Sequence, residues 1–336
     1  MDAALITIEG ARLTADEATI RQLLTAGTPF WLDLFGGDAD TTHLLRDVFQ
    51  FHPLAVEDAD HFGQRPKVDD YDQYALIVMY GVARSAPNGL IEVHCFYSEH
   101  YLVTVHHEPC PELERLTTKL QQPAHAQRLP IMLLHGVLDT LVDSFFPALS
   151  DFDDSIDDLE DAILVRPTDA QLGQLFDMKR SLVGMRKVVT PARDTVAGVI
   201  AGVGQLPGMT AESERYFRDL YDHLIRISDL VDSYRDLLSG VLDTHLSTVS
   251  NRLNVIMKQL TVIATVFLPL SFLTGFFGQN FAVLVDKIMD LTSFLVFGIG
   301  LDMLAVVVLL VWFWKRGWIG GEAEPEPKQK GSSAAG

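Results

Sequence analysis

The spacing of apolar and polar residues predicts a mixed α/β domain at the start of the chain. Five segments alternate or run apolar over strand length, and they are residues 4–8, 30–34, 74–82, 92–97 and 101–105. The last two flank a short turn and predict a hairpin. Helical patterns at 41–51 and 54–60 lie between these strands. We therefore predict a cytoplasmic α/β domain at residues 1–128.

Helical spacing replaces the strand pattern after residue 110. Residues 130–164 and 172–189 predict helices, residues 191–204 predict a shorter one, and Gly204, Pro207 and Gly208 mark a break. The far end of the first helix is acidic, with Asp151, Asp153, Asp154, Asp157, Asp158, Glu160 and Asp161. This run either attracts divalent cations or is a solvated helix face. Residues 129–208 form the predicted acidic helical region.

Residues 211–277 predict one exceptionally long helix, because no proline interrupts them before Pro269. At 1.5 Å per residue this helix is about 100 Å long. Its first half has apolar residues at strict 4-3 spacing: Leu220, Leu224, Ile227, Val231, Tyr234 and Leu238. This heptad pattern indicates a helix packed on other helices. We expect a stalk at residues 209–258 that continues directly into a membrane span.

Two apolar runs near the C-terminus predict a membrane hairpin. Residues 259–285 carry no formal charge, and residues 291–314 carry only Asp302. A membrane span needs about 20 predominantly apolar residues. We place the first span at 259–281, an outer loop at 282–293, the second span at 294–314, and a basic end with a disordered tail at 315–336.

The net charge of −19 lies almost entirely before residue 259, since the remainder holds six acids and five bases. A body this acidic excludes a nucleic-acid binder, and two cysteines exclude a disulfide framework. Bases flank the hairpin at Arg252, Lys258, Lys315 and Arg316. The positive-inside rule then places both termini in the cytoplasm of a cell (inner or plasma) membrane protein.

A second stripe follows the long helix at the same 4-3 spacing, and its residues are mostly small or polar. They are Asn254, Met257, Thr261, Ala264, Leu268, Ser271, Gly275 and Gly278. Small residues allow close helix packing, but a polar stripe also suits the wall of a water-filled pore. Two spans cannot enclose a pore, so the second interpretation requires a symmetric oligomer.

The stripe ends at Gly278-Gln279-Asn280, at the outer end of the first span. A ring of neutral amide and carbonyl oxygens accepts hydrogen bonds from the waters of a hydrated cation. Mg²⁺ releases these waters reluctantly. As a bare tripeptide the pattern is weak evidence.

Several motifs closely resemble the CorA-type divalent-cation channels of the CorA/ZntB superfamily. Residues 254–281 resemble that family's first transmembrane helix, with Pro269-Leu270-Ser271 in mid-span and a Gly-Gln-Asn variant of its Gly-Met-Asn ending. The sequence HPLAVED at 52–58 and the residues 64–68 resemble its N-terminal domain. The basic end at 315–318 also matches, so the resemblance covers nearly the whole chain.

The resemblance implies an α+β membrane protein: a homopentameric funnel in the lipid bilayer, with span two as an outer ring. It implies uptake of Mg²⁺, with Co²⁺ as a further cation, gated by intracellular Mg²⁺. By position, Gly278 and Asn280 form the selectivity filter. Ser271 forms a polar ring below it, Leu268, Leu260 and Met257 form constrictions, and Asn254 forms the inner ring. Asp219 corresponds to a regulatory metal ligand between subunits.

The sequence departs from the family pattern at three places. Gln279 replaces a methionine of the filter motif. The outer loop has Asp286 and Asp290 as its only acids, which either concentrate cations or belong to a plain solvated loop. No acid stands at 84–88, where the partner of Asp219 is expected, so cation sensing is expected to use other acids or to be weaker.

Asp302 lies in mid-span, where an ionisable residue is a functional hypothesis by default. It either couples protons to transport, as a ZntB-like zinc symporter requires, or is a protonated carboxyl hydrogen-bonded to span one. The spacing of His94, Cys95, His106, His107 and Cys110 matches no zinc-site pattern. The sequence contains neither a nucleophile elbow nor a phosphate loop, so no such motif points to an enzyme. Two alternatives to a Mg²⁺ channel stay open: a Zn²⁺ transporter and a non-conducting cation sensor.

Overall fold

The computed structural model describes residues 3–7, 9–83, 89–121, 130–202, 206–279 and 290–319. The chain divides into two compact units, Met1–His245 and Leu246–Gly336. One helix, α8, spans Ala211–Phe277 and contributes to both units. Each unit is described by itself below.

The first unit is built on a seven-stranded mixed sheet with the order β2-β1-β3-β7-β6-β5-β4. Only β3 and β7 pair in parallel among its neighbours. The strands are β1 (Ala3–Thr7), β2 (Arg12–Leu13), β3 (Phe30–Phe35), β4 (Lys67–Asp70), β5 (Ala75–Val82), β6 (Leu90–Tyr97) and β7 (Tyr101–His106). All five predicted strands are present. The two that sequence reasoning missed are short or polar.

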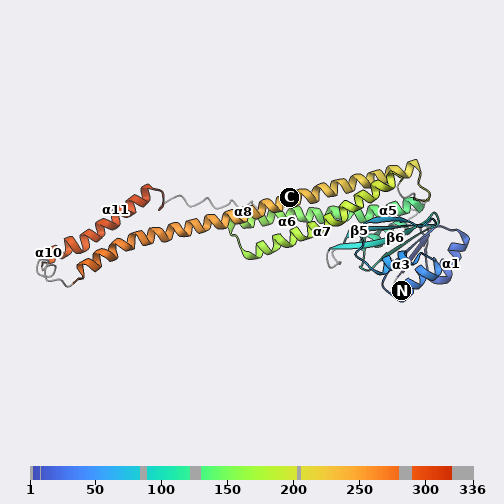
Figure 1. Ribbon diagram of the computed structural model, residues 1–336, viewed down its shortest axis with the longest axis horizontal. Helices are drawn as coiled ribbons and strands as arrows, with labels where there is room; N and C mark the ends of the chain where they lie inside the picture. The colour runs from blue at the N-terminus through green and yellow to red at the C-terminus, as the bar shows by residue number, and fades with distance from the viewer. Residues whose placement is uncertain are drawn as a thin grey trace, which may run out of the picture. The chain divides into compact units, whose positions relative to one another are not determined.

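Helices cover both faces of the sheet (Figure 1). One face packs on α1 (Glu17–Ala26), α2 (Ala39–His43), the π-helix η1 (Leu44–Val48) and α3 (Pro53–Asp60). The other packs on α4 (Pro111–Leu120), α5 (Pro130–Asp143) and the helices that follow. Successive strand residues therefore enter different cores: Leu76 belongs to the first and Ile77 to the second.

The helical layer differs from the sequence prediction at two points. The segment predicted as one helix at 130–164 is divided at Ser144 into α5 and α6 (Phe145–Val165). The two segments predicted around residue 190 form the single helix α7 (Asp169–Ile200), with Pro191 inside it. Proline costs a backbone hydrogen bond. Here Met185, Val189, Ala192 and Val196 continue one buried face across it, so packing outweighs the local break.

The heptad prediction for α8 is confirmed in the first unit. The buried residues include every predicted position, Leu220, Leu224, Ile227, Val231, Tyr234 and Leu238, and the buried face continues to Val241 and His245. Beyond His245 the helix remains apolar but its side chains are exposed, as Leu253, Ile263 and Phe267 show. Exposed apolar surface of this extent indicates a lipid or protein environment.

The second unit contains the end of α8, followed by α10 (Leu291–Ser293), the π-helix η3 (Phe294–Gly300) and α11 (Leu301–Lys315). Among the described residues, three stretches of helix are long and apolar enough to cross a bilayer: Pro130–Val165, Ala211–Phe277 and Leu291–Lys315. Half of the most apolar window of the first stretch is buried within its own unit, whereas none of that window is buried in the other two. Packing into a protein core therefore does not explain the apolar character of Ala211–Phe277 and Leu291–Lys315.

A buried charged pair lies where β3 and β7 run in parallel. His106 Nε2 is 3.3 Å from Asp33 Oδ1, and His106 Nδ1 is 2.7 Å from the carbonyl oxygen of Glu108. Thr104 donates to Asp33, and Trp31 Nε1 donates to Thr104. Burial by itself lowers the pKa of His106, but Asp33 and the Glu108 carbonyl outweigh it and raise that pKa. Both ring nitrogens face acceptors, and the raised pKa favours the protonated imidazole, in which both are donors.

We expect His106→Gln to lower the free energy of unfolding by about 2 kcal/mol near pH 6, the value of a charge-assisted buried hydrogen bond. Because the His106 pKa is raised in the folded protein, protonation of His106 stabilises the folded state at pH values below the ordinary histidine pKa of about 6.5. This stabilisation is lost as the pH rises through the pKa that His106 has in the folded protein. The destabilisation should therefore shrink in alkaline buffer. Thermal unfolding of the full chain in detergent measures it, and a difference independent of pH would contradict the assignment.

Candidate functional site

The small and polar stripe lies on the exposed side of α8 in the second unit. The predicted constriction residues on this side, Met257, Leu260 and Leu268, are 59%, 58% and 75% exposed. The half-shielded residues of the same segment include Lys258, Val262 and Val266. At 100° per residue these two sets lie on opposite sides of the helix. The other stripe members, Asn254, Thr261, Ala264, Ser271 and Gly275, are also exposed, so the whole stripe is available to line a pore or to contact another copy.

The threonines on this part of α8 satisfy their hydroxyls within the helix. Thr261, Thr265 and Thr274 each donate to the carbonyl oxygen four residues earlier, at 2.8, 2.7 and 2.5 Å. Apolar surroundings impose such internal bonding because no water replaces it. Pro269 also lies inside the helix. Proline removes one backbone donor and so leaves a carbonyl one turn earlier unpaired.

The helix ends at the predicted filter. Gly278 N donates to the Thr274 carbonyl (2.9 Å), and Gln279 N donates to the Phe276 carbonyl (3.3 Å). A Cβ on Gly278 would lie 3.1 Å from the Thr274 carbonyl oxygen, so a side chain at this position would crowd the last turn. Gln279 is exposed. Asn280 and Asp286 lie outside the described residues.

Two further predicted residues lie on or near the second apolar helix. Asp290 is exposed immediately before α10. Asp302 is in the first turn of α11, directly after η3. Its Oδ1 atom is buried without a hydrogen-bond partner in the described part of the chain. A short π-helical segment often marks a functional position, so Asp302 keeps both of its predicted roles.

In the first unit, α5 and α8 bring four ionisable residues together around Asp219. His223 Nδ1 lies 3.2 Å from Asp143 Oδ1 and 3.8 Å from Asp139 Oδ1, and its Nε2 lies 3.9 Å from Asp219 Oδ2. Ligand atoms of Asp139, Asp143 and His223 all lie within 4.8 Å of one another. We call these four residues the stalk cluster.

The stalk cluster is electrostatically unbalanced. Burial and then the neighbouring charge of Asp143 raise the pKa of Asp139. His135 lies beside the cluster, and its Nε2 shares a hydrogen bond with the Tyr216 carbonyl oxygen. Burial lowers the pKa of His135. His223 Nδ1 is buried without a correctly oriented hydrogen-bond partner. A cation at this point would offset the carboxylate charges and give His223 Nδ1 a well-oriented partner.

The donor set fits a divalent cation. Carboxylate oxygens are the preferred ligands of Mg²⁺, and an imidazole nitrogen adds affinity for Co²⁺ or Zn²⁺.

Sequence reasoning identified only Asp219. The missed residues had a local signal, because Asp139 and Asp143 are spaced i,i+4, as are Asp219 and His223, and this spacing places each pair on one helix face. The seven acids of α6 are all exposed.

A family model described as "CorA-like Mg2+ transporter protein" matches residues 27–316. The match spans both units, including the stalk cluster and the stripe on α8. The protein is a member of the CorA family. That family consists of metal-ion transporters, and the apolar surfaces of this CorA-family chain are accordingly those of a membrane protein.

Curated relatives agree with this assignment. The chain is 32% identical to YfjQ of Bacillus subtilis over 291 residues, which are 86% of this chain and 89% of the relative. It is 31% identical to the cobalt/magnesium transport protein CorA of Thermotoga maritima over 91% of this chain and 88% of that protein. The zinc transport protein ZntB of Yersinia enterocolitica is 25% identical, with 87% and 88% covered.

Solved structures confirm the fold. The complete CorA magnesium transporter from Methanocaldococcus jannaschii matches with a TM-score of 0.80 at 20% identity, covering 95% of this chain and 99% of that one. Full-length CmaX matches with a TM-score of 0.72 at 19% identity, with 94% and 97% covered. The predicted α/β domain, long helix and apolar C-terminal helices are therefore confirmed as a CorA fold.

Proposed function

We propose that this protein is a homopentameric channel for Mg²⁺, with Co²⁺ as a second cation, and that intracellular Mg²⁺ closes it. The observation that carries the proposal is the exposed stripe on α8, which lies opposite the shielded face and ends at Gly278 and Gln279. Five copies of this stripe around an axis would line a pore with small, polar and isolated apolar residues. The protein would act as a channel and not as an enzyme.

The proposed topology follows the apolar helices. Residues 259–281 and 294–314 would span the cell membrane, with the loop 282–293 outside and both termini in the cytoplasm. Residues 1–128, 129–208 and 209–258 would form the cytoplasmic domain, the acidic helical region and the stalk. The basic end would begin at residue 315.

Selectivity would arise at the outer end of the pore. Gly278 and Asn280 would present carbonyl and amide oxygens to the waters of a hydrated cation, with Gln279 at the axis or against a neighbouring helix. Neutral oxygens recognise a hydrated ion without binding it too tightly to leave. Asp286 and Asp290 would raise the cation concentration at the entrance.

The pore below would alternate polar rings with constrictions. Ser271 and Asn254 would form the outer and inner polar rings, and Leu268, Leu260 and Met257 would form the narrow apolar rings between them. Thr261, Ala264 and Gly275 complete the lining. Hydrophobic rings close a pore by excluding water when it narrows slightly.

Gating would come from the stalk cluster. A cation held by Asp139, Asp143, His223 and Asp219 would tie α5 to α8 and remove the repulsion among the carboxylates. When the intracellular concentration falls, the cation would leave and the repulsion would favour a different position of the stalk. Binding preferentially to one conformation is sufficient to shift the population.

A zinc transporter is the second candidate, because ZntB relatives match over most of this chain and Asp302 has an unpaired buried oxygen. In that case Asp302 would exchange protons during transport. If it only hydrogen-bonds to the first span, transport would not move protons. A non-conducting cation sensor would retain the stalk cluster and show no flux.

Proteoliposomes test these alternatives directly. Vesicles hold a Mg²⁺, a Zn²⁺ or a pH dye and carry a K⁺ potential set by valinomycin. We expect Mg²⁺ to enter with the potential and without a pH change. Zn²⁺ entry with co-moving protons would support the zinc transporter, and proton movement lost in Asp302→Asn would assign it to that residue. No flux of either ion, under low internal Mg²⁺, would contradict a channel.

A further inference from the structure

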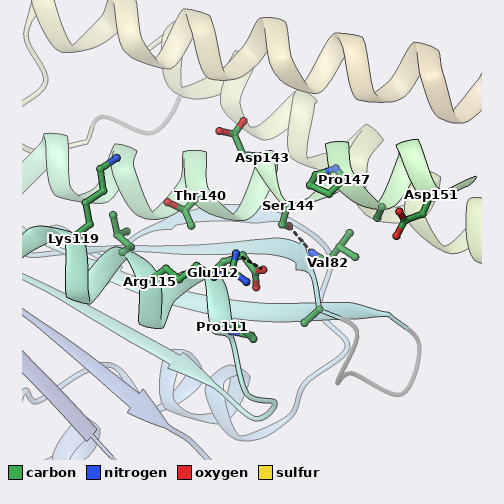
Figure 2. Close-up of a pocket in the computed structure, with 13 residues that line it drawn as sticks. Val82, Pro111, Glu112, Arg115, Lys119, Thr140, Asp143, Ser144, Pro147 and Asp151 are labelled. Carbon is green, nitrogen blue, oxygen red and sulfur yellow. Dashed lines mark hydrogen bonds and ion pairs between the residues drawn. The ribbon is translucent and has the colours of Figure 1, made fainter. Parts of the chain in front are cut away.

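A cavity of about 780 Å³ lies in the first unit between α4, α5 and the start of α6, beside the end of β5 (Figure 2). This volume falls within the usual range of about 300–1,000 Å³ for small-molecule sites. Part of the wall is apolar, with Val82, Leu116 and Pro147. The remainder carries five charged side chains, and neither the filter nor the proposed pore uses this space.

The two basic side chains of the cavity come from one face of α4. Arg115 and Lys119 are four residues apart, and Figure 2 shows Lys119 at the opposite end of the cavity from Asp151. Within the described part of the chain, the Lys119 side chain has no ion pair. Arg115 has only a long contact of 3.7 Å to Glu112. Both cations are thus available to a ligand, and guanidinium and ammonium groups are the usual partners of phosphate oxygens.

The acidic side chains set a condition on that ligand. Glu112, Asp143 and Asp151 outnumber the two bases, so the cavity repels a bare polyanion. Asp143 also belongs to the stalk cluster, and Glu112 Oε2 is buried without a hydrogen-bond partner in the described residues. A ligand that brings its own divalent cation carries less negative charge, which reduces this repulsion, and it supplies a partner for carboxylate oxygens.

The hydroxyl groups of the cavity already use their protons. Ser144 Oγ donates to the Leu141 carbonyl (2.5 Å) and accepts from Val82 N (2.7 Å). Thr140 Oγ1 donates to the Gly136 carbonyl (2.7 Å). Recognition of an anion therefore falls to Arg115 and Lys119, which makes their removal a clean test.

We propose that this cavity binds the complex of a divalent cation with a polyphosphate anion. Arg115 and Lys119 bind phosphate oxygens, and the unpartnered carboxylate oxygen of Glu112 contributes to the cation. A nucleoside triphosphate and inorganic tripolyphosphate share this chemistry. The apolar wall near Pro147 offers a surface for the nucleobase of the former.

Isothermal titration calorimetry of the full chain in detergent tests the proposal with defined probes. ATP and tripolyphosphate are titrated separately in Mg²⁺ and in EDTA, with adenosine in Mg²⁺ as a third probe. We expect both polyphosphates to bind in Mg²⁺ and to lose binding in EDTA. Tighter binding of ATP assigns the nucleotide as the source, whereas equal binding assigns inorganic polyphosphate. Binding of adenosine alone would overturn the assignment, because it lacks phosphate.

Variants locate the binding to the cavity. Arg115→Ala and Lys119→Gln are each expected to weaken the affinity about tenfold, as loss of one charge-assisted hydrogen bond implies. The matched control is Arg180→Ala, because Arg180 is an arginine with an 81% exposed side chain on α7. The side chains of Arg115 and Lys119 are exposed, so their substitution should not affect folding. Thermal unfolding midpoints of all variants verify this.

Three further results would overturn the proposal: no binding of either polyphosphate in Mg²⁺, undiminished binding in EDTA, or unchanged binding in the Arg115→Ala/Lys119→Gln double variant. Binding is measured without transport, so the outcomes separate from those of the channel proposal. Flux without polyphosphate binding rejects only this site. Binding without flux rejects the channel and leaves the site in place.

Discussion

Asn280→Leu should abolish divalent-cation flux in proteoliposomes while leaving the protein folded and inserted. In every subunit the change replaces the Asn280 amide of the proposed filter with an apolar side chain that accepts no hydrogen bond from a hydrated ion. Losing even one such bond, worth about 1–1.5 kcal/mol, slows entry roughly tenfold. We expect a reduction of at least that size in the initial rate of Mg²⁺ entry under a K⁺ potential.

The matched control is Asn251→Leu, the same substitution on the same helix but off the stripe. Asn251 is exposed and lies on the opposite side of α8 from the stripe by helical geometry, so its flux should equal that of the wild type. Equal losses in both variants would indicate a general effect on insertion. Undiminished flux in Asn280→Leu would reject the filter assignment.

Asp139→Asn/Asp219→Asn should leave the channel open at Mg²⁺ concentrations that close the wild type. The double variant removes two of the four proposed ligands and leaves the shape of both side chains nearly unchanged. Because burial and Asp143 raise the pKa of Asp139, neutralising it also relieves repulsion in the absence of a cation. We expect the internal Mg²⁺ concentration for half-maximal closure to rise at least about tenfold, equivalent to 1.4 kcal/mol of binding.

Flux at graded internal Mg²⁺ concentrations measures this shift, and the Mg²⁺-dependent rise in thermal unfolding midpoint provides a reading independent of transport. Asp157→Asn/Asp158→Asn is the control, since it removes the same charge from exposed positions on α6. An equal shift in the control would show that cation sensing depends on total acidity. No shift in either variant would exclude the stalk cluster from gating.

The sequence predicted those features that depend on local spacing. The buried face of α8 repeats every three to four residues from Leu220 to Leu238, and this periodicity is visible without knowledge of the partners. The apolar helices near the C-terminus are likewise evident, because span length and hydropathy are properties of a continuous segment. Central strands such as β5 and β6 were found for the same reason.

Local signals misled the prediction where tertiary packing overrides them. Pro191 suggested a helix break, but buried residues on both sides hold α7 together through it. The two-residue β2 and the polar β4 carry too little pattern to be recognised, and they exist because β1 and β5 pair with them. Pairing partners are not encoded in a strand's own spacing.

By itself, then, the sequence determined the long helix, the apolar C-terminal helices, the stripe that ends at Gly278 and the family resemblance, because each resides in one continuous segment. Only the tertiary structure decided the stalk cluster and the cavity. Asp139 and Asp143 on α5 meet His223 on α8 across about eighty residues of intervening sequence, and Asp219 lies beside His223 on the same helix. Arg115 of α4 and Ser144, which lies between α5 and α6, likewise line one cavity. Packing of separate helices against one sheet sets these distances, and no spacing along the chain contains them.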